Sequence, residues 1–370
     1  MKHLWWLAVV LCLLPNARAE AAAAEKAGPL ANKKPPVVCP EGLSYSHHDW
    51  RLVCDNTCTC RAAGYQSDDD ALFVSLLLTR KAGPDEPVTA DFLIGGDGEE
   101  RPADKLPSTF GVSLRLRIND RDVGKLVIED NMFAELGTRE ISTLLRALLR
   151  NSKIELVAGD IGWRLSDKGA AAVLLKMDEY QGRLGTPGAL VRKGKRSERS
   201  VFAPRLAPVV IAVPFHKPLP GDERFVTENS VALQEALRAT LNDDDGYCPK
   251  LVEDDWPRFR AIRLTETKML VSTDCWRRTY NNGTGYWVFN TLAPYDPTLI
   301  TTSASHLIGS TISADRKGRD TGDCWNSDEW TWDGARFIHT KSSSSAMCKP
   351  NVPPDGWVLP TIVTEVRTAR

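Results

Sequence analysis

Apolar residues along this chain follow a two-residue period in many short segments and a helical period in only a few. Residues 111–118 (GVSLRLRI) alternate between apolar and polar side chains, which is typical of a half-buried strand. Residues 138–150 and 167–181 repeat apolar residues at helical spacing, with Thr138 and Ser166 as the expected N-caps. The other strands predicted in this half are 50–54, 60–66, 71–79, 123–129 and 153–158.

This pattern ends at a change of composition near residue 185. We expect residues 38–185 to form an α+β domain that is rich in strands and holds two helices. Residues 186–228 are rich in proline, glycine and basic side chains, and regularly spaced prolines favour a semi-rigid linker. The basic run 191–199 (VRKGKRSER) either touches anionic lipid or glycan or is a solvated part of this linker, and the second role is the commoner one.

The second half begins with a short helix and then changes to strands. Helical spacing over 230–241 is followed by a segment, 246–370, with little helical period and many aromatic residues. Asn, Gly and Asp clusters at 281–285 (NNGTG) and 333–334 (DG) predict turns between strands. The predicted strands are 259–264, 268–274, 285–290, 298–302, 329–332 and 335–340. We therefore expect a mostly β, aromatic-rich C-terminal domain over 229–370.

The N-terminus has the layout of a cleavable secretory signal. A positive start precedes an apolar run from Leu4 to Leu14 and a small-residue site that ends at Ala19, so residues 1–19 are the expected signal and cleavage is expected after Ala19. The run is too short to span a membrane, and no later segment is long and uncharged enough to do so. Residues 20–37 are expected to be a disordered lead-in. A lipid anchor on Cys12 is disfavoured, because Leu11 is large for that motif. The sequence predicts a periplasmic protein with no transmembrane segment.

Net charge and cysteine content bear on the partners of the chain and on its disulfides. The 370-residue chain has a net charge of −1, and loss of Lys2 and Arg18 with the signal makes it −3, which argues against nucleic acid as a partner. An even number of cysteines in an exported chain indicates structural disulfides, because the periplasm is oxidising. The cysteines of the mature chain are Cys39, Cys54, Cys58, Cys60, Cys248, Cys275, Cys324 and Cys348. They form two groups of four, so each domain is expected to close its own bridges.

Five stretches of the chain together resemble a family of exported bacterial proteins, domain of unknown function 1176. They are DWRLVCDNTCTCRAAGY (49–65), KMDEYQGRLGTPGAL (176–190), LVSTDCWRRTYNNGTGYWVF (270–289), KGRDTGDC (317–324) and EWTWDGARF (329–337). The resemblance implies an envelope location and a shared fold, and it implies no activity. The first half also resembles the invasion-associated locus B proteins, which are small exported β-rich domains.

The resemblance also implies a disulfide pairing. The six cysteines that characterise the family fall on Cys54, Cys60, Cys248, Cys275, Cys324 and Cys348, while Cys39 and Cys58 are additional. The implied pairs are Cys39–Cys58, Cys54–Cys60, Cys248–Cys275 and Cys324–Cys348. In the chain-entropy model such loops contribute roughly 2.4 to 3.6 kcal/mol each.

Residues that commonly carry chemistry give no catalytic, cofactor or metal site. His47 and His48 beside the first cysteine cluster have some likeness to a zinc site, but thiols in this compartment are more often oxidised. Residues 242–246 (NDDDG) fail as a calcium loop, because Leu241 and Val252 fall where oxygen ligands are required. Together with the acidic run 253–255 they form either a looser cation site or a solvated acidic turn, and the turn is the commoner role. No nucleophile elbow, Ser-x-x-Lys pair or His-Glu-x-x-His helix is present. No cofactor is expected.

The aromatic C-terminal half holds the best candidate for a binding surface. Trp330 and Trp332 are two residues apart and share one face of a strand, which is either core or a platform for a ligand, and core is the commoner role. The candidate surface residues are Tyr280, Tyr286, Trp287, Lys317, Arg319, Asp320, Asp323, Trp330 and Trp332. The sequence therefore favours a disulfide-stabilised protein that binds an envelope protein or glycan. The alternatives are a periplasmic inhibitor or immunity-type protein, and an envelope hydrolase of glycan or ester.

Overall fold

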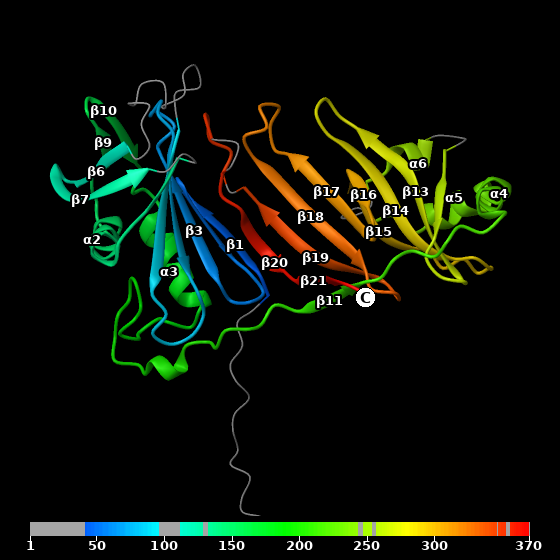
Figure 1. Ribbon diagram of the computed structural model, residues 1–370, viewed down its shortest axis with the longest axis horizontal. Helices are drawn as coiled ribbons and strands as arrows, with labels where there is room; N and C mark the ends of the chain where they lie inside the picture. The colour runs from blue at the N-terminus through cyan, green and yellow to red at the C-terminus, as the bar shows by residue number, and fades with distance from the viewer. Residues whose placement is uncertain are drawn as a thin grey trace, which may run out of the picture. The chain divides into compact units, whose positions relative to one another are not determined.

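The computed structural model describes residues 41–95, 112–128, 132–242, 247–253, 257–345, 347–352 and 356–369. All of these residues belong to one compact unit, 37–370. Antiparallel sheets dominate it and short helices accompany them, which confirms the predicted α+β, β-rich class (Figure 1). Within the described residues, no helix is long and apolar enough to cross a membrane.

The first sheet has six antiparallel strands in the order β1-β2-β3-β4-β5-β8. They are β1 (Leu43–His47), β2 (Trp50–Cys54), β3 (Cys60–Tyr65), β4 (Val74–Arg80), β5 (Val88–Ile94) and β8 (Phe133–Glu135). Successive residues of β2 enter different cores, since Leu52 lies in one hydrophobic cluster and Val53 in another. Both faces of β2, β3 and β4 are therefore covered, and most residues of these three strands are buried.

The larger of these two cores lies between the first sheet, a second sheet and two helices. The second sheet has the order β10-β9-β6-β7. The elements are β6 (Val112–Ile118), β7 (Arg121–Ile128), β9 (Ile154–Ala158), β10 (Ile161–Leu165), α2 (Thr138–Leu148) and α3 (Ala170–Tyr180). The predicted caps were wrong by one and three residues: the N-caps are Gly137 and Gly169, and neither helix has a side-chain cap.

The C-terminal half is built on a four-stranded sheet that is also covered on both faces. Its strands, in the order β12-β13-β14-β15, alternate their side chains between two cores: Met269 and Trp287 lie in one, Leu270 and Tyr286 in the other. The elements are α4 (Asp222–Glu228), α5 (Ser230–Arg238), α6 (Pro249–Glu253), β12 (Arg260–Arg263), β13 (Lys268–Arg277), β14 (Asn282–Asn290) and β15 (Thr298–Ala304). Residues of α4, α5 and α6 supply the helical side of the first of these cores.

A five-stranded sheet closes the second of these cores. Its order is β16-β17-β18-β19-β20, and Ile312 and Trp332 point from it into the cluster that holds Leu270. The strands are β16 (His306–Ile308), β17 (Thr311–Lys317), β18 (Trp325–Trp332), β19 (Phe337–Ser344) and β20 (Leu359–Val363). The hairpin between β18 and β19 turns at Asp333 and Gly334, as predicted.

The last residues of the chain pack back on the first sheet. Trp357 joins its outer core and donates a hydrogen bond from Nε1 to Ser75 Oγ at 2.7 Å. Lys349 Nζ contacts Asp49 and Asp68 at 2.9 and 2.7 Å. The final strand, β21 (Glu365–Thr368), pairs in parallel with β11 (Val209–Ala212). The C-terminal segment is thus part of the core that lies beneath β2 and β4.

Two local features differ from the sequence-based expectations. Part of the segment expected to be a linker is folded: Thr186 and Ala189 are fully buried, and α4 begins at Asp222. Buried polar side chains hold this segment, and composition gives no sign of such partners. The turn predicted at 281–285 lies instead at 278–281, because β14 begins at Asn282. The boundaries of the two expected domains stay a prediction.

Candidate functional site

One face of the five-stranded sheet points away from its core. The pairing of β17 with β18 is regular, so alternate residues of β18 lie on opposite faces. Trp330 and Trp332 face the core, and Trp325 lies on the other side. The residues that share this outer face, here called the Trp325 face, are Asp315, Lys317, Trp325, Ser327, Lys341 and Ser343.

Trp325 is the large aromatic residue of this face, and its ring is held in place. The indole Nε1 donates to the Gly322 carbonyl oxygen at 2.8 Å. The ammonium nitrogen of Lys317, the residue paired with Trp325 across the strands, lies 5.4 Å from the ring centroid. Even so, 39% of Trp325 is exposed. A ring that is both oriented and exposed loses little conformational entropy when a ligand packs on it.

A disulfide fixes the loop that leads into Trp325. Cys324 is bonded to Cys348, and the Gly318 N–H donates to the Cys324 carbonyl oxygen at 2.8 Å. A Cβ atom at Gly318 would lie 2.5 Å from the Cys324 sulfur, so only glycine lets the loop pass this close. The predicted loop 317–323 is therefore pinned at its end. Its side chains Arg319 and Asp323 form an ion pair, which raises the pKa of Arg319 despite partial burial.

A first hollow of ≈ 640 Å³ lies on one side of Trp325. The turn after β13 forms its opposite wall, where 44% of Tyr280 is exposed. Asn281 ties this turn to the end of β17, because its amide donates to the Lys317 carbonyl oxygen at 2.9 Å and its Oδ1 accepts from the Lys317 N–H at 3.0 Å. His306 and Asp315 complete the wall, with 3.5 Å between Nε2 and Oδ2.

A second, smaller hollow of ≈ 210 Å³ lies beside it and is also lined by Trp325. Its floor is polar and carries the side chains of Ser327 and Ser343. Residues of the C-terminal segment, Trp357 among them, form the remaining wall. Trp325 therefore separates two hollows, and both of them include residues of the same sheet face.

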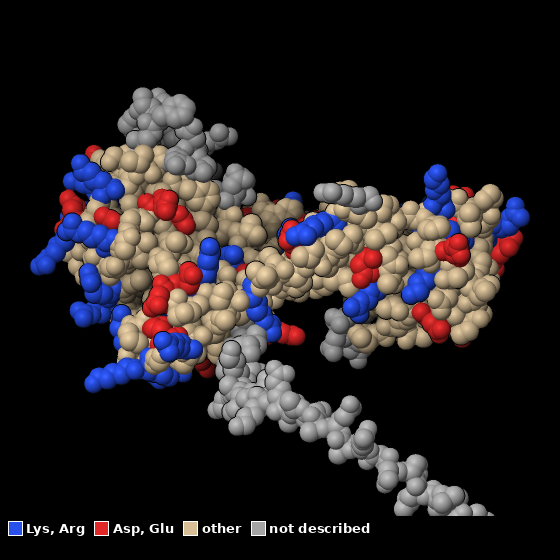
Figure 2. Space-filling model, turned by 60° about the horizontal axis from the view of Figure 1, so that its bottom comes forward, with Lys and Arg blue, Asp and Glu red and all other residues tan. Residues whose placement is uncertain are grey.

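The charged side chains that line each hollow cancel in formal charge: Asp315 and Lys317 line the first hollow, and Asp323 and Lys341 line the second. Lys341 Nζ lies 2.9 Å from Glu329 Oε1, and Asp323 is paired with Arg319. Lysine and arginine side chains are likewise interspersed with acidic ones over the surface shown in Figure 2. The site therefore has no strong net charge that would attract an ionic ligand over a distance.

The described residues hold no group of three or more potential metal ligands that could bind an ion. Cys54, Cys58 and Cys60 are all disulfide-bonded, so none of them is a thiolate ligand for zinc. Among the described residues, His306 pairs with Asp315 at 3.5 Å and His339 pairs with Asp328 at 3.0 Å. Burial alone would raise the pKa of Asp328, but hydrogen bonds from His339 and Ser342 and the nearby Arg316 lower it below its usual range.

Several of the surface residues expected from the sequence are core residues instead. Trp287 and Trp332 are fully buried, Tyr286 is 9% exposed, and Trp330 is half-buried with its ring stacked on His339. By contrast, Tyr280 and Lys317 line the first hollow and Asp323 lines the second. Asp320 and Arg319 lie on the pinned loop outside both hollows.

The sequence reasoning missed Trp325, His306 and Asp315 as site residues. The available signal was alternation, since a strand that places Trp330 and Trp332 inward places position 325 outward. Alternation places position 325 outward only if the strand begins at Trp325. The polar residues at 326–328 made that start unrecognisable in the sequence, so β18 was predicted to begin later.

The three disulfides formed between described cysteines match the pairing implied by the family resemblance. They are Cys54–Cys60, Cys248–Cys275 and Cys324–Cys348. Cys58 is also disulfide-bonded, and its expected partner Cys39 lies outside the described residues. Residues 243–246 (DDDG) also lie outside them.

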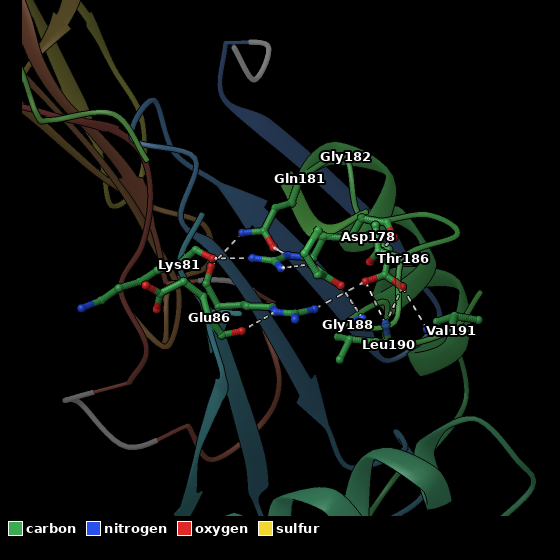
Figure 3. A network of polar contacts seen from close by, with 12 residues as sticks. Lys81, Glu86, Asp178, Gln181, Gly182, Thr186, Gly188, Leu190 and Val191 are labelled. Carbon is green, nitrogen blue, oxygen red and sulfur yellow. Dashed lines mark hydrogen bonds and ion pairs between the residues drawn. The ribbon is translucent and has the colours of Figure 1, made fainter. Parts of the chain in front are cut away.

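A second group of polar residues lies buried beside α3 (Figure 3). The Asp178 carboxylate points at the backbone of the following segment and accepts from the N–H groups of Leu190 and Val191, at 2.8 and 2.9 Å for the nearer oxygen. Gln181 Nε2 donates to the carbonyl oxygens of Cys58 and Arg80 at 3.0 and 2.9 Å. These side chains satisfy backbone groups, so they anchor the segment after α3.

Two arginines complete this network. Arg183 is fully buried and donates to the carbonyl oxygens of Gly83 and Lys81 at 2.6 and 3.1 Å. Arg80 lies 3.7 Å from Asp178, and burial lowers the pKa of Arg80 to about 10. The two positive charges are balanced by Asp178 and by Glu198, which lies 3.9 Å from Arg183. We interpret this network as structural, because it is directed at the protein's own backbone.

Comparison with known proteins places this fold in a group without an assigned activity. The model of the family described as protein of unknown function (DUF1176) matches residues 44–364. The uncharacterized protein YpfG of Escherichia coli (strain K12) is 25% identical over 337 residues, which cover 84% of this chain and 90% of that protein. No solved structure matches. The likeness of the first half to invasion-associated locus B proteins stays a prediction.

Proposed function

The chain belongs to the DUF1176 family of proteins of unknown function, and we propose that it is an exported, periplasmic binding protein whose ligand contacts the Trp325 face. The observation that carries this proposal is the exposed, oriented ring of Trp325 between two hollows. Trp and Tyr are enriched among the residues that contribute most binding energy at the centre of interfaces, which supports Trp325 as the central contact.

The rigidity of the site supports binding over catalysis. The Cys324–Cys348 disulfide and the hydrogen bonds between the Asn281 side chain and the Lys317 backbone fix the two walls of the first hollow in the absence of a ligand. A preformed site loses less entropy on binding. Among the described residues that line it, His306 and Asp315 form a pair, and the hydroxyl of the neighbouring Ser305 is engaged with the backbone of Asp315. That hydroxyl is therefore not oriented toward His306 as a nucleophile would be.

Export is the second part of this proposal, and the N-terminal signal pattern and the disulfides support it. Mass spectrometry of protein isolated by osmotic shock tests it. We expect a chain that begins at Glu20 and contains disulfides. Full-length protein with free thiols in the cytoplasmic fraction would contradict export.

Binding is tested by co-sedimentation of the purified mature protein with envelope fractions from its own cells. Trp325→Ala is expected to weaken binding about 30-fold, the loss expected when a central aromatic contact of about 2 kcal/mol is removed. Tyr247→Ala is the matched control, because Tyr247 is an aromatic residue with 59% exposure that lines neither hollow. Equal binding by wild type and Trp325→Ala would refute the proposal.

A further inference from the structure

We propose that the ligand of the Trp325 face is a linear, uncharged glycan chain that crosses Trp325 and occupies both hollows. This inference rests on the binding function proposed above and names the class of ligand. It is carried by three properties of the face and of the hollows beside it: the exposed aromatic rings, the hydroxyl and amide groups that line the hollows, and the arrangement of the two hollows.

The aromatic rings suit sugar rings. Trp325 and Tyr280 line the first hollow and are both well exposed. The C–H groups of a pyranose form an apolar face that packs on a flat aromatic ring, while the hydroxyls at its edge remain free for hydrogen bonds. Because Trp325 Nε1 is already bonded to Gly322, the ring offers its face rather than its donor.

The polar groups around the rings suit hydroxyls rather than charges. The second hollow is lined by Ser327, Ser343 and Ser344, whose hydroxyls make no hydrogen bond with other described residues. Asn282 adds to the first hollow a side-chain amide that makes no hydrogen bond with other described residues. Hydroxyls and amides both donate and accept, which matches a polyol. Since each hollow is lined by one acidic and one basic side chain, its formal charges cancel and the site favours an uncharged sugar.

The arrangement of the hollows suits a chain of several sugars. The first hollow includes Asp315 and Lys317 of β17, and the second includes Ser327 and Ser343 of β18 and β19. These residues share one face of one sheet, so the two hollows follow each other across the strands with Trp325 between them. A single sugar fills only one of the hollows, whereas an unbranched chain occupies both.

Isothermal titration calorimetry with defined oligosaccharides tests this inference. The probes are the β-1,4-linked dimer and hexamer of N-acetylglucosamine, with cellohexaose and maltohexaose for comparison. We expect at least one hexamer to bind at least tenfold more tightly than its dimer, because only the longer chain reaches the second hollow. The affinity is expected to be unchanged between low and high salt.

Two variants locate the chain on the protein. Trp325→Ala is expected to weaken binding of both lengths about 30-fold. Ser343→Arg fills the second hollow and is expected to reduce hexamer affinity to that of the dimer, while dimer affinity stays at the wild-type value. Equal loss for both lengths in Ser343→Arg would overturn the two-hollow arrangement.

The outcomes separate this inference from the proposed function. If no oligosaccharide binds at millimolar concentration while envelope binding still requires Trp325, the glycan inference is wrong and the binding function stands, with a protein ligand favoured. Binding that weakens strongly with salt would overturn the uncharged character of the ligand. If envelope binding does not require Trp325, both proposals fail.

Discussion

Removal of the Cys324–Cys348 disulfide is expected to loosen the Trp325 face selectively. The bridge spans a sequence separation of 24 residues that contains the β18–β19 hairpin. In the chain-entropy model a closed loop of this size contributes about 3.5 kcal/mol at 25 °C. The Cys324→Ala/Cys348→Ala double variant avoids both a free thiol and a buried hydroxyl, because Cys324 is buried and Ala is apolar.

Hydrogen exchange and urea unfolding measure this effect. The N–H groups of Gly318 and Ser345 are bonded within the pinned region, to Cys324 and Trp325 carbonyl oxygens. Their opening free energies are expected to fall by up to about 3.5 kcal/mol. Amides in β3 and β4 of the first sheet serve as internal controls and should change little. A loss below about 1 kcal/mol at Gly318 would refute the entropic reasoning.

The remaining predictions concern the framework that carries the site. Asp178→Asn is expected to cost about 3 kcal/mol in urea unfolding, because it leaves the buried Arg80 without its ion-pair partner; Glu179→Gln on the exposed side of α3 is the matched control. For Lys349, burial lowers the pKa but hydrogen bonds to Asp68 and Asp49 outweigh it and raise the pKa above 10.5. Its contribution to stability should therefore be complete below about pH 10 and lost as the pH rises further, and Lys349→Met should remove that alkaline loss from the pH profile of unfolding. Gly285→Ala is expected to destabilise the protein strongly in thermal unfolding, since a Cβ there would lie 2.3 Å from the Trp287 ring.

Strands with a clear apolar pattern were predictable, and polar ones were not. Strands β13 and β14, which are buried on both faces, were predicted from apolar runs such as MLVS and YWVF. β17 (TISADRK) was missed, because only its inward face is apolar and its outward face belongs to the polar site. The central turns of helices α2 and α3 were predicted from the sequence, whereas their N-cap residues were not. Both N-caps are glycines, which have no side chain that could mark the start of a helix.

Most of the structure that the sequence did not predict depends on contacts between segments far apart in the chain. Trp357 bonds Ser75 across 282 positions, and Asn56 holds the Val363 backbone across 307. The spacing of apolar residues within a short segment gives no information about such pairs. The second hollow depends on them, because Trp357 forms one of its walls. Tyr280 and Lys317, two of the residues proposed from the sequence, line the first hollow, whereas the walls formed by distant segments could be found only from the fold.

Photo-crosslinking in living cells tests most directly whether the Trp325 face binds an envelope ligand. A photoreactive amino acid replaces Ser343 in the second hollow, and in a control it replaces Val127, which is 59% exposed on β7. We expect a crosslinked adduct at position 343 that disappears when Trp325→Ala is added, and none at position 127. Equal adducts at both positions, or an adduct at 343 that persists without Trp325, would contradict the account.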